Sequence, residues 1–229
     1  MRTAIYFTPA PDHPLTLAAA RWLGRNVYGD EAVGEPDHEG ISPQDWRELT
    51  AAPRRYGFHA TLKAPFSLDA TRSVAGLDTA IQAWATETAP FELPALALRR
   101  IGSFFALVPG EPSETLQGFA GDVVKAFELF RAPLDEVEFA RRTKADLTQR
   151  QVESVRKWGY PYVFDDFRFH MTLTGPVPQE KQALLQEVLG RQFAEFIGKP
   201  LTIDALALCV EPAAGADFTV FSRHALREP

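Results

Sequence analysis

The sequence predicts an α+β protein in which a unit of one strand, one helix and two further strands occurs twice. The first observation is a pair of stretches around His59 and His170, each reading His-x-Thr-Leu within a run that alternates apolar and polar residues. Such alternation is typical of a half-buried β-strand, because successive side chains point to opposite faces of the sheet. The second observation is that Ala-Leu-Ala-Leu follows each histidine at nearly the same distance, at 95–98 and 205–208. An internal repeat of this kind predicts a duplicated architecture.

Two such units would form two lobes, each a small antiparallel sheet with helices on its outer face, with a central cleft between the lobes. We expect one bilobal domain over 1–229, with a first repeat at about 56–110 and a second at about 167–226. A helical segment at about 111–166 would join the repeats, and 1–55 would add an N-terminal strand and helices. If the two sheets face each other, the exposed faces of the two His strands meet in the cleft.

The N-terminal elements follow from apolar spacing and capping residues. Residues 2–8 alternate and end before two prolines, which predicts the first strand. Apolar residues at helical spacing predict a helix over 15–27. The acidic stretch 29–42 is rich in glycine and proline, which is typical of a loop. A Ser-Pro pair would begin a helix over 43–50, with Ser42 as the N-cap and the proline at the first helical position.

The elements after each His strand repeat in the same order. A helix with apolar residues on one side comes first, and two alternating strands follow it. The predicted ranges are 71–88, 91–99 and 103–108 in the first unit, and 179–196, 201–210 and 218–224 in the second. This shared order makes the duplication the organising feature of the chain.

Two helices are expected between the repeats. The apolar spacing of 116–130 predicts the first of them. The second would cover 144–158, with Thr143-x-x-Asp146 as a capping box and Gly159 as its C-terminal stop. Tyr160 and Tyr162 then flank a proline just before the second His strand, where they could form a lid or a wall for a flat substrate. The alternative is that these aromatic rings only pack the linker against a lobe.

The alternation divides each His strand into an inner and an outer face. The residues expected to face a core are Phe58, Ala60, Leu62 and Ala64 in the first strand, and Phe169, Met171 and Leu173 in the second. The residues expected on the opposite faces are His59, Thr61 and Lys63 in the first strand, and Arg168, His170, Thr172 and Thr174 in the second. Each outer face therefore combines a titratable imidazole with a hydroxyl group two residues further on.

Composition narrows the classes of partner. The net charge of −6 and the pI of about 5.4 argue against a broad basic surface that tracks long nucleic acid, but they leave room for a small anionic substrate. The single cysteine, Cys209, lies in an apolar run and is expected to be buried in a strand. No apolar stretch approaches the ~18 residues of a membrane span, and the N-terminus has too little positive charge for a secretory signal. With this N-terminus, we expect a cytoplasmic soluble protein.

The paired dyads have the chemistry needed to cleave a phosphodiester. Histidine exchanges protons near neutrality, so one imidazole can act as general base while the other acts as general acid. Threonine hydroxyls can donate hydrogen bonds to oxygens that gain charge in the transition state. Lys63 and Arg168, expected on the same faces, would add positive charge near an anion. This inventory fits phosphodiester cleavage without a metal or a cofactor.

Other chemistries fit the sequence less well. The chain has neither the Gly-x-Ser-x-Gly elbow of a serine hydrolase nor a Gly-x-x-x-x-Gly-Lys loop. A metal site would need a third ligand besides the paired histidines. His13 and His38 lie in proline-rich or acidic loops, and His224 lies near the end of the last strand. We therefore expect no metal site.

The two motifs, His59-Ala60-Thr61-Leu62 and His170-Met171-Thr172-Leu173, resemble those of the 2H phosphoesterase superfamily, which is marked by two His-x-Thr/Ser-x motifs in duplicated units. The wider stretch from Arg55 to Phe66 resembles a bacterial branch often encoded with genes for phosphonate breakdown. The resemblance implies a bilobal fold, metal-independent chemistry, His59 and His170 as the acid–base pair, and Thr61 and Thr172 on the phosphate. It also implies a substrate with a cyclic phosphate or a 2′-5′ linkage.

The resulting prediction is a metal-independent phosphodiesterase acting on a small cyclic phosphate, either nucleoside 2′,3′-cyclic or ribosyl cyclic. The residues expected to bind the substrate are Lys63, Arg168, Tyr56, Tyr160, Tyr162 and Thr174. The alternatives are a module that binds a nucleotide or RNA end without cleaving it, and an RNA 2′-5′ ligase-like activity. The pattern assigns neither histidine specifically to the role of base or acid.

Overall fold

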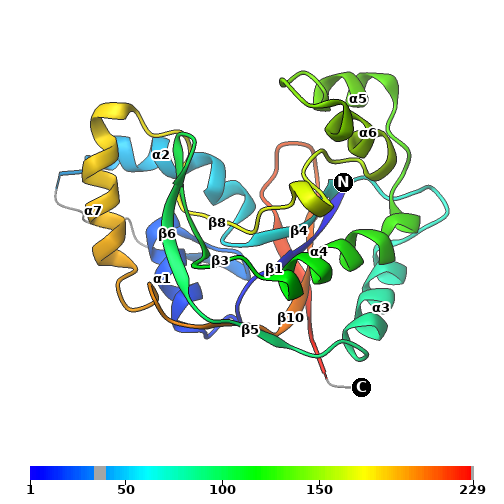
Figure 1. Ribbon diagram of the computed structural model, residues 1–229, viewed down its shortest axis with the longest axis horizontal. Coiled ribbons are helices and arrows are strands. Elements are labelled where there is room, and N and C mark those ends of the chain that lie inside the picture. The colour runs from blue at the N-terminus through cyan, green and yellow to red at the C-terminus, as the bar shows by residue number, and fades with distance from the viewer. Residues whose placement is uncertain (34–39, 228–229) are drawn as a thin grey trace.

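The computed structural model describes residues 1–33 and 40–227 and has the predicted α+β fold (Figure 1). Its main sheet has seven strands in the order β11-β10-β1-β4-β8-β7-β6, and every neighbouring pair is antiparallel. These strands are β1 (Arg2–Phe7), β4 (Ala60–Phe66), β6 (Leu96–Ile101), β7 (Phe104–Pro109), β8 (Met171–Thr172), β10 (Ala205–Glu211) and β11 (Thr219–Ala225). Two short pairs lie apart from it, β2 (Arg25–Asn26) with β3 (Gly29–Ala32), and β5 (Phe91–Leu93) with β9 (Leu201–Ile203).

The strand order shows that the two repeats exchange their hairpins. The first His strand, β4, pairs with β1, which pairs in turn with the β10–β11 hairpin of the second repeat. The second His strand, β8, pairs with the β7–β6 hairpin of the first repeat. The two halves meet where β4 and β8 pair, so the sheet is continuous through both His strands. Each half therefore contains strands from both repeats.

The helices are α1 (Pro14–Leu23), α2 (Pro43–Tyr56), α3 (Val74–Ala85), α4 (Glu114–Ala126), α5 (Glu136–Arg142), α6 (Gln149–Trp158) and α7 (Gln182–Gln192). Short 3-10 turns in the described part of the chain are η1 (Glu128–Phe130), η2 (Phe164–Asp166) and η3 (Gln179–Lys181). In Figure 1, α2 and α7 lie beside the β6 end of the sheet, and α5 and α6 stand above the opposite half. Among the described residues, no helix has the length and apolarity needed to cross a membrane.

Several boundaries differ from the predictions. The range 29–42 was expected to be a loop, but 29–32 forms β3, while 34–39, which includes His38, lies outside the described residues. The predicted strands 91–99 and 201–210 are each divided into two, a short strand that lies apart from the main sheet (β5 or β9) and a longer strand within it (β6 or β10). The predicted second His strand is reduced to Met171–Thr172, where Met171 pairs with both β4 and β7 and Thr172 pairs with β7.

Helix α2 continues past the predicted end at about residue 50, through Pro53 to Tyr56. A proline within a helix removes the hydrogen bond to the carbonyl four residues earlier. Here that carbonyl belongs to Leu49, and it accepts a hydrogen bond from the backbone N–H of Gly175 instead. The tertiary contact thus satisfies the group that the proline leaves unpaired, and the helix carries Tyr56 to the start of β4.

The segment before the second His strand also differs from the prediction. The capping box expected at Thr143 and Asp146 is wrong, because Thr143 ends α5, a helix that was not predicted. The capping box is instead formed by Thr148 and Gln151, so α6 begins at Gln149. Gly159 ends α6 in the left-handed conformation, as predicted.

One face of the sheet carries the main core. Buried residues of α1, α2, α3, α4 and α7 pack there against inward residues of the strands. Trp22 of α1 donates a hydrogen bond from Nε1 to the carbonyl of Leu173 at 2.7 Å, which ties the helix layer to β8. A smaller cluster lies apart from it, formed by Tyr6, Cys209 and their neighbours, with Cys209 buried as predicted. Tyr6 and the outer residues of β4 belong to the surface that the helix layer leaves open.

Candidate active site

The two His-x-Thr dyads meet where β4 pairs with β8. Ala60 lies opposite Met171 in this antiparallel pair, and both side chains face the core. The antiparallel register therefore places His59 across from Thr172, and Thr61 across from His170, on the other face. Side chains directly opposite on neighbouring strands have Cβ atoms about 4.5–5.5 Å apart. All four residues line one cleft, and its volume is about 490 Å³.

Each imidazole is held by the same backbone contact. Nδ1 of His59 lies 2.8 Å from the carbonyl oxygen of Gly57, and Nδ1 of His170 lies 2.7 Å from that of Arg168. A carbonyl oxygen only accepts, so Nδ1 carries the hydrogen in both rings and each neutral imidazole presents an Nε2 lone pair. Nε2 of His59 lies 3.1 Å from Oγ1 of Thr61, which can donate its hydroxyl hydrogen to it.

His59 is the more enclosed of the two rings. The Tyr6 ring stacks on it with a centroid distance of 3.8 Å. The pKa of His59 is lowered from 6.5 to about 4, mainly by burial and to a smaller extent by the nearby His170, while the hydrogen bond to Gly57 opposes the shift. At neutral pH His59 is therefore an uncharged imidazole, as a general base requires.

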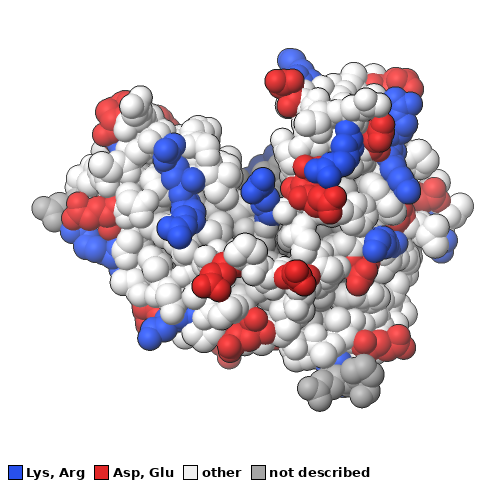
Figure 2. All heavy atoms as spheres, in the orientation of Figure 1, with Lys and Arg blue, Asp and Glu red and all other residues white. Residues whose placement is uncertain are grey.

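The cleft collects aromatic and cationic side chains around the dyads. Tyr56, Tyr160 and Tyr162 line it, as the prediction of substrate contacts requires. The rings of Tyr160 and Tyr162 meet edge to face, and Tyr162 is 45% exposed. Burial raises the pKa of Tyr160 to about 12, so its hydroxyl remains a hydrogen-bond donor at physiological pH. Figure 2 shows a deep notch between the two halves of the molecule, with Lys and Arg atoms on both sides.

Three arginines in the lining were missed by the sequence analysis. Arg2 begins β1, and Arg141 and Arg142 end α5. No local pattern marks them, because the fold brings them to the cleft from segments far from either motif. Tyr6, also missed, could have been found from the alternation of β1 once its pairing with Thr61 was known.

The structure places Lys63 away from the cleft, which corrects the prediction. Tyr6 pairs with Thr61, but its neighbour Ile5 pairs with Lys63, so β4 has one extra residue here, a β-bulge. The bulge turns Lys63 to the helix-covered face, where its Nζ lies 2.7 Å from Glu128 Oε2 and 3.1 Å from the carbonyl of Val124. Lys63 is therefore a buried ion-pair partner, with only 3% of its surface exposed.

The bulge also changes the role of the residue that follows. Ala64 was predicted to face the core, but it lines the cleft instead. A shift of one residue reverses the faces of the side chains that follow it. The predicted faces are thus correct from Phe58 to Leu62 and wrong at Lys63 and Ala64, and a second register shift between Ile5 and Thr3 returns Phe66 to the main core.

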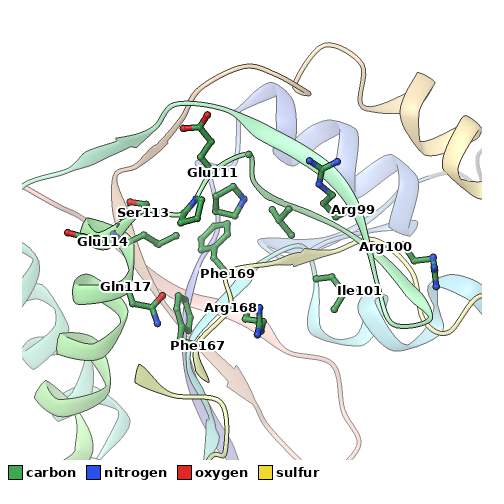
Figure 3. Close-up of a pocket in the computed structure, with 15 residues that line it drawn as sticks. Arg99, Arg100, Ile101, Glu111, Ser113, Glu114, Gln117, Phe167, Arg168 and Phe169 are labelled. Carbon is green, nitrogen blue, oxygen red and sulfur yellow. Dashed lines mark hydrogen bonds between the residues drawn. The ribbon is translucent and has the colours of Figure 1, made fainter. Parts of the chain in front are cut away.

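Arg168 and Thr174 do not line the cleft either. Arg168 lies in a separate groove with Arg99, Glu111 and Phe167 (Figure 3). Its contribution to the cleft is the backbone carbonyl that orients His170. Thr174 is fully buried, and its hydroxyl oxygen accepts a hydrogen bond from the backbone N–H of Phe105 at 3.0 Å. Its position indicates a structural role in joining the end of the second His strand to β7.

The other two described histidines lie outside the cleft. His13 caps α1 by accepting a hydrogen bond from the backbone N–H of Leu15. His224 lies on β11 and its Nε2 is 2.7 Å from Asp78 of α3. Within 1–33 and 40–227, no three His, Cys, Asp or Glu side chains are grouped closely enough to hold a metal ion.

The sequence was compared with known protein families and curated proteins. The family described as "Protein of unknown function (DUF1045)" matches residues 61–219, more than half of the chain. The chain belongs to this family.

The chain is also similar to longer proteins. It is 37% identical over 226 residues to a ribose 1,5-bisphosphate phosphokinase PhnN of Janthinobacterium sp. (strain Marseille), a match that covers 97% of this chain and 50% of the relative. The PhnN of Laribacter hongkongensis is 35% identical over 219 residues, covering 95% of this chain and 50% of that protein. The chain thus spans about half the length of the curated relatives it matches.

Solved structures with a similar arrangement are more distant. The protein TT0787 of Thermus thermophilus has 14% sequence identity and a TM-score of 0.47, covering 100% of this chain and 99% of that one. E. coli LigT complexed with 3′-AMP has 12% sequence identity and a TM-score of 0.43, and the match covers 98% of this chain and 97% of that one. Likeness at this level is too remote to carry an argument, so the function has to be argued from the site itself.

Proposed function

We propose that this chain is a metal-independent phosphodiesterase that hydrolyses a small cyclic phosphate by two-histidine acid–base catalysis. The observation that carries the proposal is that both dyads line one cleft, on either side of the paired Ala60 and Met171. The antiparallel register then sets His59 opposite Thr172 and His170 opposite Thr61. A phosphoryl group between them would have an imidazole on either side and a hydroxyl beside each imidazole. The resemblance of both motifs to those of 2H phosphoesterases supports the same chemistry.

The environment of the two rings supports His59 as the base. Nε2 of His59, neutral at pH 7, would take a proton from the water that attacks phosphorus. As the bond to the leaving oxygen breaks, protonated His170 would donate a proton from Nε2 to that oxygen. The product is an opened phosphate monoester, and the imidazoles exchange their protonation states, which solvent restores. Thr61 and Thr172 would hydrogen-bond the other phosphate oxygens, the former by leaving its contact with His59.

The pH dependence of kcat/KM tests the assignment of His59. Because its pKa is lowered to about 4, His59 binds a proton in the free enzyme only below about pH 4, rather than below 6.5. We expect no decline in kcat/KM as the pH falls through 6.5, and a decline only as it approaches 4. A bound phosphate anion would favour protonated His59, so the acidic limb of kcat should lie at a higher pH than that of kcat/KM. Circular dichroism across the range would exclude acid unfolding. An acidic limb at 6.5 or above would contradict His59 as the base.

The substrate proposed is a ribose-based cyclic phosphate processed in the cytoplasm. The cleft of about 490 Å³ fits a sugar-sized molecule, and three arginines in its lining favour an anion. The matched relatives bear a name that refers to a phosphorylated ribose, and the resemblance of the first motif points to phosphonate breakdown. A ribosyl cyclic phosphate or a nucleoside 2′,3′-cyclic phosphate would meet these requirements.

A panel of cyclic phosphates tests the proposed function directly. The panel would contain nucleoside 2′,3′-cyclic and ribosyl 1,2-cyclic phosphates, incubated with the wild-type chain and with the His59→Ala/His170→Ala double variant. We expect the wild type to open at least one of them to a monoester, the double variant to be inactive, and EDTA to have no effect. Binding of these compounds without any product would instead indicate a non-catalytic binding module.

A further inference from the structure

A second cavity lies next to the cleft and carries a concentration of arginines. Its volume is about 660 Å³, and five arginines line it against two acidic residues. We call it the arginine recess: Arg2, Arg55, Arg131, Arg141 and Arg142, with Asp135 and Glu138 as the acidic lining. Such an excess of positive charge is notable in a chain whose net charge is −6. The recess therefore favours an anionic ligand.

Buried or half-buried carboxylates hold these arginines in place. The fully buried side chain of Glu211 accepts hydrogen bonds from Arg2 and Arg55, and Glu138 accepts them from Arg141 and Arg142. Hydrogen bonds from the arginines lower the pKa of both carboxyls to about 2, so they remain charged. Each carboxylate pairs with two guanidiniums, so each set of one glutamate and two arginines keeps a net positive charge.

The guanidiniums have more donors than these carboxylates engage. A guanidinium carries five N–H groups in a planar fork. Arg141 uses Nε and one terminal nitrogen for Glu138, and its side chain is 62% exposed. Arg55 uses one terminal nitrogen for Glu211 and Nε for the carbonyl of Ala216. Oriented donors of this kind are suited to an oxyanion with several oxygens.

The recess adjoins the cleft of the two dyads. Arg2, Arg141 and Arg142 line both cavities. An anion in the recess would therefore lie beside residues that also line the cleft where His59 and His170 would act on the phosphoryl group. One small molecule can reach both positions if it carries two anionic groups.

We propose that the arginine recess binds a phosphate monoester on the substrate, remote from the phosphodiester that reacts. This inference takes the identity of the reacting group, a cyclic phosphodiester, from the proposed function and rests on it. A phosphate monoester is favoured over a carboxylate because it carries more negative charge and three terminal oxygens, which can accept from guanidiniums that approach from several sides, whereas a carboxylate carries one charge on two oxygens. The substrate is then a cyclic phosphodiester with a second phosphate, and the recess selects it over its singly phosphorylated counterpart.

A pair of substrates that differ only in the remote phosphate tests this proposal. Adenosine 2′,3′-cyclic phosphate and its 5′-phosphorylated form would be assayed on the same enzyme preparation, so that any loss of folded protein cancels in the ratio of their kcat/KM values. Two or more charge-assisted hydrogen bonds predict a wild-type preference of roughly 10- to 100-fold for the 5′-phosphorylated substrate. Arg55→Gln, and the exposed Arg141→Gln as a second variant, should bring the ratio towards one.

A matched control is Arg191→Gln, which removes the same charge on α7, a helix that lines neither cavity. This variant should keep the wild-type ratio. A wild-type ratio near one, with both substrates cleaved, would overturn the recess proposal and leave the proposed function standing. A wild-type preference that neither Arg55→Gln nor Arg141→Gln reduces would also overturn the recess proposal.

A binding measurement separates the recess from catalysis. Ribose 5-phosphate and ribose would be titrated calorimetrically into the wild type, Arg55→Gln and the His59→Ala/His170→Ala double variant. We expect the wild type and the double variant to bind only ribose 5-phosphate, with affinity that falls as salt rises, and Arg55→Gln to bind it at least ~10-fold more weakly. If this holds but no cyclic phosphate is cleaved, the proposed function is wrong and the recess is still an anion site. No binding of ribose 5-phosphate by the wild type would overturn the recess.

Discussion

Replacement of either His59 or His170 by alanine is expected to lower kcat/KM on a cyclic phosphate by about 10²–10⁴, the usual contribution of one general acid or base. Both Nδ1 atoms donate to backbone carbonyls, so both rings present Nε2 to the same cleft. No other histidine within the described residues lines that cleft. Loss of either ring therefore removes one of the two proton transfers.

The control for this prediction is another histidine of the same chain. His224 contacts Asp78 on α3 and lies outside the cleft, so His224→Ala should keep activity within a few-fold of wild type. Thermal unfolding would show whether each variant is folded. The double variant should be little worse than the poorer single one, because residues that act on one transition state are not additive. A folded His59→Ala or His170→Ala variant with nearly full turnover would disprove the two-histidine mechanism.

The dyads could be found from the sequence because they depend on local order. A half-buried strand shows its period of two wherever it lies, so the alternation places the four dyad residues on one open face without any knowledge of the neighbouring strands. The same reasoning gives the wrong face for Lys63. Its face is set by a bulge against Ile5 of β1, and a bulge is a property of the pair of strands rather than of one strand.

The exchange of hairpins could not be predicted for a related reason. The two repeats have the same pattern of apolar residues, so a hairpin of either repeat can cover a His strand of either repeat and bury an equivalent surface. The structure places β10–β11 next to β1 and β6–β7 next to β8. Only long-range packing distinguishes this arrangement from the unexchanged one. The same topology brings Arg2 and α5 to the cleft, which is why the arginine recess has no sequence signature.

The second large effect is expected at Gly57, the residue between α2 and the first dyad. Its backbone has φ 72° and ψ 174°, a conformation that is almost confined to glycine. A Cβ there would lie 2.4 Å from Cγ2 and 2.5 Å from Cβ of Val27, well inside van der Waals contact. Strain and overpacking each cost about 1–3 kcal/mol, so Gly57→Ala should lower the free energy of unfolding by about 2–5 kcal/mol. Urea unfolding would measure this loss.

Gly57→Ala should also lower kcat/KM in the fraction that remains folded. The carbonyl of Gly57 holds Nδ1 of His59, so a shifted backbone would release the ring from its tautomer and from its stack on Tyr6. A ring that is less buried regains a pKa closer to 6.5, and the acidic limb of kcat/KM should move up from about 4. Gly118→Ala is the control, because a Cβ there meets nothing within 4 Å, and alanine in a helix should raise stability slightly and leave the pH profile unchanged. If Gly57→Ala is destabilised but keeps the wild-type acidic limb, the carbonyl does not position His59, and the ring stays buried without it.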